Sequence, residues 1–168
     1  MLFALTVTQY SKMLDNLAAC LDKAAHYAEQ KKIDVEVLLH SRLAPDQFNL
    51  IRQVQIACDT AKFGAARVCG KEAPSHPDTE KTLAELQARI KTVQTYLASF
   101  SQEDFAGAED RRVSQPRWEG KYLSGLEFII QHSIPNLYFH VTTAYSILRH
   151  NGVDLGKKDF LGSMPYKL

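Results

Sequence analysis

Apolar residues recur at helical spacing along most of the chain, and the clearest case lies near its start. Between residues 7 and 29 they are separated by alternating steps of three and four positions: Val7, Tyr10, Leu14, Leu17, Leu21, Ala24 and Ala28. This spacing places them in one stripe on one face of a helix. Charged residues of the same segment, such as Asp15 and Asp22, fall outside the stripe. We therefore expect a first helix over residues 7–29 with one face in a core.

Two further segments show the same periodicity. The second helix is predicted to start at Pro45, because proline suits a first helical turn, and to stop at Gly70, which suits a left-handed cap. The third is predicted to follow Asp78, a good N-cap residue, and to reach Leu97. Residues 30–44 connect the first two helices. They are apolar enough to lie against the end of a helical bundle.

The fourth helix is predicted to begin near Ile134-Pro135 and to stop at Asn151-Gly152. Almost every residue from 137 to 148 is apolar or small, which is typical of a central helix. Residues 101–118 are charged and irregular, and long connections of this kind are often lids or crossovers. We expect extended or irregular structure over 119–133 and a tail that lies back over the bundle. The predicted fold is all-α, a four-helix bundle with a long irregular connection between the third and fourth helices.

Composition changes this picture little and excludes several functions. The 168 residues are 45% hydrophobic and 23% charged, which suits one globular domain over residues 1–168. The 20 basic and 19 acidic residues form no basic stripe, so we expect no nucleic-acid partner. No apolar run approaches the roughly 20 residues of a membrane span, and the start lacks the basic region of a signal peptide. We therefore expect a cytoplasmic protein with no membrane partner.

The three cysteines, Cys20, Cys58 and Cys69, form no CxxC motif and lie among helix-forming residues. Buried free thiols are the expected state of such an odd-numbered, scattered set.

Candidate chemistry gathers on the fourth helix. Asn136 and His140 are four positions apart, so they project from one face. On the second helix Gln53 has apolar neighbours, which suggests partial burial. These three residues either line a polar pocket inside the bundle or form hydrogen bonds that serve only the core. Tyr145 is a candidate pocket residue, although an aromatic side chain near a helix junction is more often part of a core.

Any enzymatic role would fall to His140, because an imidazole with its ordinary pKa near 6.5 can act as a general acid or base. His132, just before the predicted fourth helix, is placed to reach the mouth of a pocket.

A long stretch of the fourth helix resembles a known family. The residues Phe-His-Val-Thr-Thr-Ala-Tyr, followed by Leu-Arg-His-Asn-Gly-Val, lie within 135–153, and 53–59 and 156–162 support the likeness. They resemble a bacterial family of unknown function that looks like a branch of the DinB/YfiT-like helical-bundle superfamily. The resemblance covers nearly the whole chain. It implies a four-helix bundle that is often dimeric, so a homodimer is expected.

Many members of that superfamily hold a divalent metal with three histidines, one on the second helix and two, four apart, on the last. Some members transfer thiol cofactors or act as thiol-dependent isomerases. The corresponding positions here are Gln53, Asn136 and His140, so one imidazole of three remains. Amide oxygens are poor ligands for zinc or nickel compared with imidazole. We therefore expect no metal and no cofactor.

Three functional hypotheses follow. The first is a bundle that binds a small molecule or thiol in a pocket of Gln53, Asn136 and His140, with Tyr145 nearby. The second is a non-catalytic, dimeric structural or stress-related bundle whose polar core residues fix the register of its helices. The third is a metal-dependent enzyme similar to the thiol transferases, with a degenerate metal site.

Overall fold

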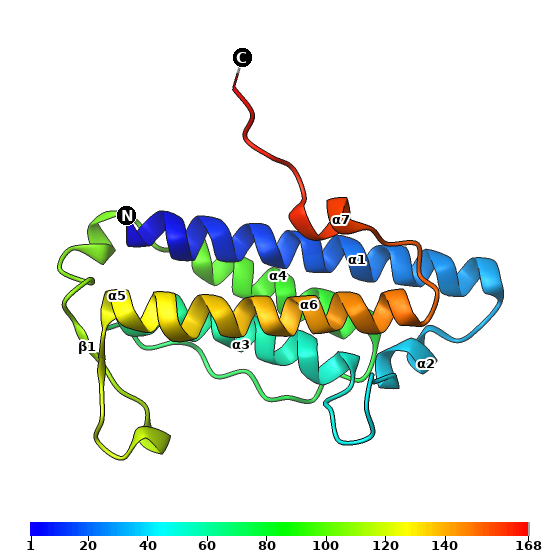
Figure 1. Ribbon diagram of the computed structural model, residues 1–168, viewed down its shortest axis with the longest axis horizontal. Coiled ribbons are helices and arrows are strands. Elements are labelled where there is room, and N and C mark those ends of the chain that lie inside the picture. The colour runs from blue at the N-terminus through cyan, green and yellow to red at the C-terminus, as the bar shows by residue number, and fades with distance from the viewer. Residues whose placement is uncertain (168) are drawn as a thin grey trace.

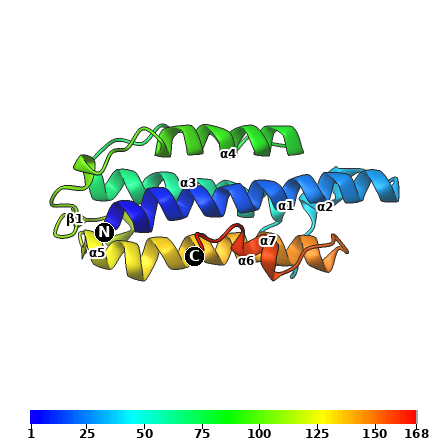
Figure 2. The ribbon, with the colours of Figure 1, turned by 90° about the horizontal axis from the view of Figure 1, so that it is seen from above.

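The long helices of the protein lie side by side in a computed structural model that describes residues 1–167 (Figure 1). They are α1 (Gln9–Lys31), α3 (Leu50–Cys69), α4 (Leu83–Leu97) and α6 (Ile134–His150). Helix α3 packs against both α4 and α6, and α1 packs against the same two helices. Seen from above, α4 and α6 lie on opposite sides of α1 and α3 (Figure 2). The prediction of an all-α fold is confirmed, with a single small pair of strands beside the helices in the part of the chain described.

Shorter elements join and cover these helices. They are a π-helical turn before α1 (Ala4–Thr8), α2 (Val35–His40), α5 (Gly125–Phe128), a second π-helical turn (Ile129–Ser133) and α7 (Lys157–Leu161). Strand β1 (Arg112–Val113) pairs antiparallel with β2 (Leu123–Ser124). Two 3-10 turns, Glu103–Phe105 and Pro116–Trp118, complete the set.

The apolar stripe predicted for the first helix faces the core. Its seven members, from Val7 to Ala28, are all buried, and Tyr10, Leu14 and Leu21 have no exposed area. The Tyr10 hydroxyl is also buried, and it donates to Oγ of Ser133 at 2.7 Å. Gly64 of α3 makes this contact possible, because a Cβ there would lie 2.5 Å from Ser133 Oγ. Helices α1, α3 and α6 therefore approach closely around one small residue.

The starts predicted for the second and third helices are wrong, and side-chain capping explains both. Helix α3 begins at Leu50, five residues after Pro45, because Oδ1 of Asn49 accepts the backbone N–H of Arg52 at 3.1 Å. The cap of α4 is Thr82 and not Asp78. Thr82 and Glu85 satisfy each other's backbone N–H groups in a capping box.

The largest correction concerns residues 119–133, which were expected to be extended or irregular. Only β2 is extended there, and a continuous helical segment starts at Gly125 and runs through Pro135 into α6 (Figure 1). Ser124 and Glu127 form a capping box that starts it. A π-helical turn directly before Pro135 interrupts the regular hydrogen bonding, and such turns accommodate irregularities within helices. Helix α6 itself begins at Ile134, as predicted, but residues 125–133 before it are helical and not irregular.

The segment from 98 to 124 crosses the end of the bundle and carries a projecting arm, residues 112–124, built on the β1–β2 pair (Figure 1). Gly125 fixes where this segment meets the last helix. A Cβ at Gly125 would lie 1.8 Å from the backbone oxygen of Ala108, so only glycine allows the two backbones to approach this closely.

Cys20, Cys58 and Cys69 are free and buried, as expected. Burial raises the pKa of the Cys58 thiol to about 12 and that of Cys20 to about 11, which makes both poor nucleophiles at neutral pH. Over residues 1–167, no helix has the length and apolar character needed to cross a membrane.

Candidate functional site

His140 and Gln53 meet directly across the interface of α6 and α3. His140 Nδ1 lies 2.7 Å from Gln53 Oε1, and Gln53 Nε2 donates to the backbone oxygen of Phe48 at 3.0 Å. Because the amide oxygen can only accept, the neutral ring carries its proton on Nδ1. Gln53 is 1% exposed and His140 7% exposed. His140 is thus hydrogen-bonded directly to Gln53, and Gln53 to the backbone of Phe48, with no cavity between the two side chains.

Burial holds His140 neutral. Desolvation, with a smaller contribution from the nearby Arg52 cation, lowers the pKa of His140 to about 4. At neutral pH the ring can accept a proton only weakly and has none to deliver from Nε2. This environment is that of a satisfied core histidine and not that of a general acid.

Asn136 lies one turn earlier on α6 and has a different partner. Its Nδ2 donates to Oγ1 of Thr60 at 2.7 Å, two turns along α3 from Gln53. The structure therefore brings Gln53 and His140 together and places Asn136 in a separate, half-buried contact. Two separate hydrogen bonds, Gln53–His140 and Thr60–Asn136, therefore join α3 and α6, instead of one three-residue cluster.

Tyr145 lies away from both of these hydrogen bonds. It packs edge-on against Phe160 of α7, with ring centroids 6.4 Å apart, and helps to line a shallow, mostly apolar groove of about 170 Å³. Helix α7 thus covers Tyr145, and this part of the tail lies back over the bundle as expected, whereas residues 163–167 are exposed and extend away from it (Figure 1). The geometry gives Tyr145 a packing role with α7.

A polar cavity of about 150 Å³ opens beside Asn136, between α3, the start of the last helix and the projecting arm. We call it the Asn136 cavity. Its lining residues are Asp59, Thr60, Phe63, Arg67, Gln115, Arg117, Phe128, His132, Ser133 and Asn136. The cavity combines cationic, amide, imidazole and hydroxyl groups with an aromatic wall, which is the mixture typical of a small-molecule site.

Two residues that line this cavity each have a buried nitrogen atom without a hydrogen-bond partner among residues 1–167. They are Nε2 of Gln115 and Nδ1 of His132. Arg117 Nη2 lies 2.9 Å from His132 Nε2, and because a guanidinium only donates, the neutral ring must carry its proton on Nδ1. The two unpartnered atoms are therefore N–H donors. Buried donors without acceptors are uncommon in native proteins, and each is a candidate contact for a ligand or an ordered water.

Only part of this cavity was visible from the sequence. The positions of Asn136 and His132 were singled out because they lie on or just before the last helix. Gln115 and Arg117 were missed, because they lie in the arm and nothing in the linear pattern places it against α3. Arg67 was missed because it sits near the end of the second helix among ordinary surface charges.

A second polar cluster joins α3 and α4. The carboxylate of Asp59 pairs with Lys62 and Arg89 at 2.9 Å each, and Arg89 also pairs with Glu80 at 3.0 Å. Lys62 Nζ lies 3.1 Å from His76 Nδ1. Because its cations have carboxylate partners, the charges of this cluster balance one another, and its ion pairs join α3 to α4.

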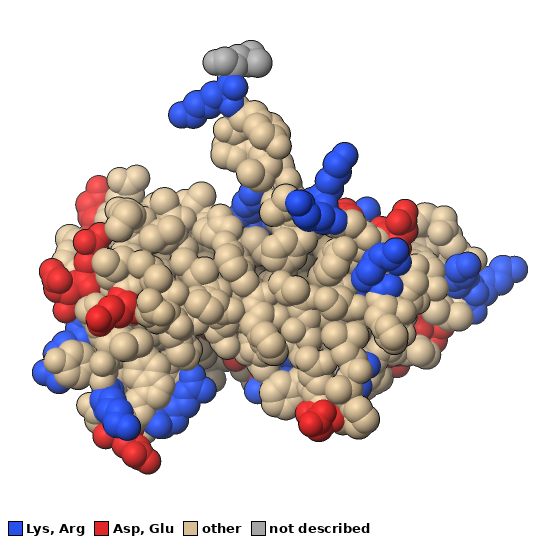
Figure 3. Space-filling view, viewed as in Figure 1, with Lys and Arg blue, Asp and Glu red and all other residues tan. Residues whose placement is uncertain are grey.

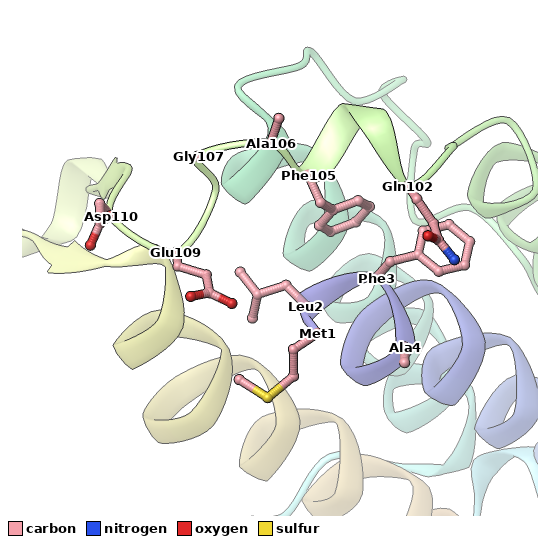
Figure 4. A pocket seen from close by; sticks show the side chains of 10 residues that line it. All are labelled: Met1, Leu2, Phe3, Ala4, Gln102, Phe105, Ala106, Gly107, Glu109 and Asp110. Carbon is pink, nitrogen blue, oxygen red and sulfur yellow. The ribbon is translucent and has the colours of Figure 1, made fainter.

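A more spacious cavity, about 480 Å³, lies where the N-terminus meets the loop 102–110. In Figure 4 the side chains of Leu2, Phe3 and Phe105 come together there, while Glu109 faces Leu2 and Met1. Glu109 and Asp110 are its charged lining residues. It lacks the convergent donors of the Asn136 cavity.

The three positions that correspond to a histidine metal site do not fit a metal. Gln53 and His140 are hydrogen-bonded to each other, Asn136 is engaged with Thr60, and two of the three donors are amides. No group of three or more His, Cys, Asp or Glu side chains within residues 1–167 is arranged to hold a metal ion.

Comparison with known proteins agrees with the resemblance seen in the sequence. A family model described as a domain of unknown function, DUF1993, matches residues 2–161. A crystal structure of a DinB family member protein from Shewanella denitrificans is 66% identical, covers 100% of this chain and 96% of its own, and superposes with a TM-score of 0.98. None of the curated proteins matches the chain significantly. The chain therefore belongs to the DUF1993 family of DinB-like helical domains.

Proposed function

We propose that this protein binds a small polar molecule in the Asn136 cavity, as a DinB-like four-helix bundle whose ligand site lies beside the position of the superfamily's metal. The observation that carries the proposal is the pair of buried, unpartnered N–H donors, Gln115 Nε2 and His132 Nδ1, on the wall of one cavity. A bound acceptor would satisfy both at once. Leaving a buried polar group unsatisfied costs about 1–3 kcal/mol, so its pairing would favour the bound state.

The surroundings of the cavity support the same proposal. Asn136 holds its position through Thr60, so its amide is oriented before any ligand arrives. Phe128 stacks on the His132 ring with centroids 5.3 Å apart, and Trp118 meets the same ring edge-on at 5.5 Å. Fixed side chains of this kind lower the ordering cost of binding.

A structural role is favoured for the remaining pair, Gln53 and His140. Their hydrogen bond joins two packed helices in the core, and a one-turn slip of either helix would break it. This corresponds to the hypothesis of polar residues that fix helix register. It coexists with ligand binding in the neighbouring cavity.

A thermal-shift screen of metabolites, small thiols included, tests the proposal. A ligand that binds only the folded state raises the melting temperature. At a concentration one hundred times its dissociation constant, it adds about 2.7 kcal/mol to the free energy of unfolding. We expect at least one polar compound to stabilise the wild type. We expect Asn136→Leu to abolish the shift, because it keeps the branched shape of the side chain and removes the amide.

The matched control is Gln131→Leu, which replaces an exposed amide on the same helical segment. It should retain the shift caused by the ligand. The proposal is wrong if no compound shifts the wild type, or if the shift survives in Asn136→Leu as fully as in Gln131→Leu.

A further inference from the structure

The Asn136 cavity has an excess of positive charge that nothing in the described chain balances. Arg67 and Arg117 both line it, and no carboxylate within residues 1–167 forms an ion pair with either guanidinium. Burial and the proximity of Arg117 lower the pKa of Arg67. Two cations therefore face one small space and repel each other.

The one carboxylate on the lining does not remove this excess. Asp59 is shared between Lys62 and Arg89, each at 2.9 Å, and those two cations lie on the side of α4. Its charge is already neutralised before the two arginines of the cavity are counted. A cationic or neutral ligand would leave Arg67 and Arg117 unpaired.

The other polar groups also favour an acceptor-rich ligand. Nδ1 of His132 and Nε2 of Gln115 are buried donors without partners. His132 is held neutral, because burial and the cations Arg117 and Arg67 lower its pKa. It therefore offers one N–H at a defined position. Two guanidinium groups and two N–H donors together match the oxygens of an oxyanion.

The size of the space limits the ligand. About 150 Å³ is smaller than the roughly 300–1,000 Å³ typical of pockets for drug-sized molecules. It suits a small ion or the charged end of a longer molecule.

Figure 3 shows Lys and Arg atoms gathered on the arm, residues 112–124, with a few acidic atoms beside them. By contrast, the surface over the middle of α6 is largely uncharged in this view, so the arm offers positive charge close to the cavity.

We propose that the Asn136 cavity binds an oxyanion, the carboxylate or phosphate group of a small metabolite, between Arg67 of α3 and Arg117 of the arm. His132 and Gln115 donate to the same group, and Asn136 contacts the remainder of the molecule. This inference rests on the proposed function, since it names the chemical class of ligand for that site. It also assigns the arm a role, because Arg117 and Gln115 reach the ligand only while the arm lies against α3.

The single tryptophan provides the readout. Trp118 follows Arg117 and contacts the His132 ring, so its fluorescence reports on the site. We would titrate the full chain with inorganic phosphate and, separately, with succinate, at constant ionic strength set with chloride. We expect a saturable change with at least one of them, and the comparison of the two arms identifies the preferred oxyanion.

Substitutions then locate the response. Arg67→Gln and Arg117→Gln should each weaken binding about tenfold or more, because each removes one guanidinium from the anion. Arg112→Gln is the matched control. It removes the same charge from the same arm, but Arg112 is exposed and stacks on Tyr122. It should change the dissociation constant by less than about twofold, since Arg112 is not among the residues that line the cavity. If Arg67→Gln does not fold, Arg117→Gln in the exposed arm still decides the question.

The outcomes separate this inference from the proposed function. Absence of a saturable response to phosphate and to succinate overturns the oxyanion assignment, as does equal weakening by Arg112→Gln and Arg117→Gln. If in addition an uncharged compound binds and is lost in Asn136→Leu alone, the cavity is a ligand site of different chemistry. If no compound responds to Asn136→Leu, the ligand site itself is wrong.

Discussion

At the scale of single residues, the two histidines of the last helical segment differ in what their partners leave free. His140 Nδ1 donates to Gln53, which satisfies the one N–H of the neutral ring. His132 instead accepts from Arg117, which leaves its N–H buried and unpartnered. Both rings are neutral at physiological pH because burial lowers their pKa values. The partner atom, and not burial alone, therefore distinguishes a core histidine from a candidate binding residue.

The depressed pKa of His140 predicts a pH dependence of stability. In the unfolded chain the imidazole takes up a proton near pH 6.5, whereas in the fold it does so only near about 4. The unfolded state thus binds more protons between these values, and the contribution of His140 to stability is lost as the pH falls through that window. Relative to its value at pH 7, this contribution should be smaller by about 2 kcal/mol at pH 5.

The measurement is urea unfolding of the wild type and of His140→Gln at several pH values. The variant keeps a polar side chain and every other titrating group, so the difference between the two curves isolates His140. A difference in unfolding free energy that stays constant from pH 7 to pH 5 would contradict the assignment of His140 as a buried neutral ring.

At the scale of elements, the sequence predicted the buried face of a helix better than the residues at which helices begin. The stripe of α1 was visible because seven buried positions repeat at one spacing, and burial is the main cause of that pattern. The start of α6 at Ile134 was predicted from Pro135, but the helical residues 125–133 before it were missed. The stronger signal lay earlier, in the capping pair Ser124 and Glu127. A π-helical turn, which has no simple sequence signature, carries the helix through the proline.

The candidate site shows the same limit. Gln53 and His140 were singled out together from the helical pattern and the family resemblance, and they are hydrogen-bonded. Arg117 and Gln115 could not be placed, because the arm reaches α3 through a tertiary contact between distant parts of the chain. Neither residue lies in a periodic segment.

The contact of Gly125 with Ala108 predicts how strongly the arm segment depends on one glycine. Gly125→Ala should destabilise the protein by about 3 kcal/mol or more, because the new methyl group would overlap a backbone oxygen and force two segments apart. Gly156→Ala is the control, since a Cβ there meets nothing within 4 Å and φ is −134°. Its effect should stay near or below about 1 kcal/mol. Thermal or urea unfolding of both variants checks this, and equal losses would show that the close approach is not limiting.

At the scale of the whole molecule, the two sides of α3 make different polar contacts, and Asp59 belongs both to the cluster with α4 and to the lining of the cavity. One side contributes Asp59 and Lys62 to the charge-balanced cluster with α4. The opposite side pairs with α6 through Gln53 and Thr60, and beyond Thr60 it opens into the Asn136 cavity. The metal-dependent hypothesis loses support at this scale, because the donors at the superfamily's metal position are used to join helices.

The homodimer expected from the family resemblance stays a prediction. Sedimentation velocity of the purified chain at micromolar concentration should show a species of twice the 18.9 kDa monomer mass. A monomer at that concentration would contradict it.

The account depends most on the two unpartnered donors becoming partnered when a ligand binds. Their nitrogen atoms can be followed directly by ¹H–¹⁵N NMR of the labelled protein, with the side-chain amide of Gln115 and the imidazole of His132 resolved, during titration with the compound that stabilises it best. We predict that both signals move and saturate together, while the imidazole of His140 stays unchanged. Saturable binding that leaves the Gln115 and His132 signals in place would contradict the assignment of the site.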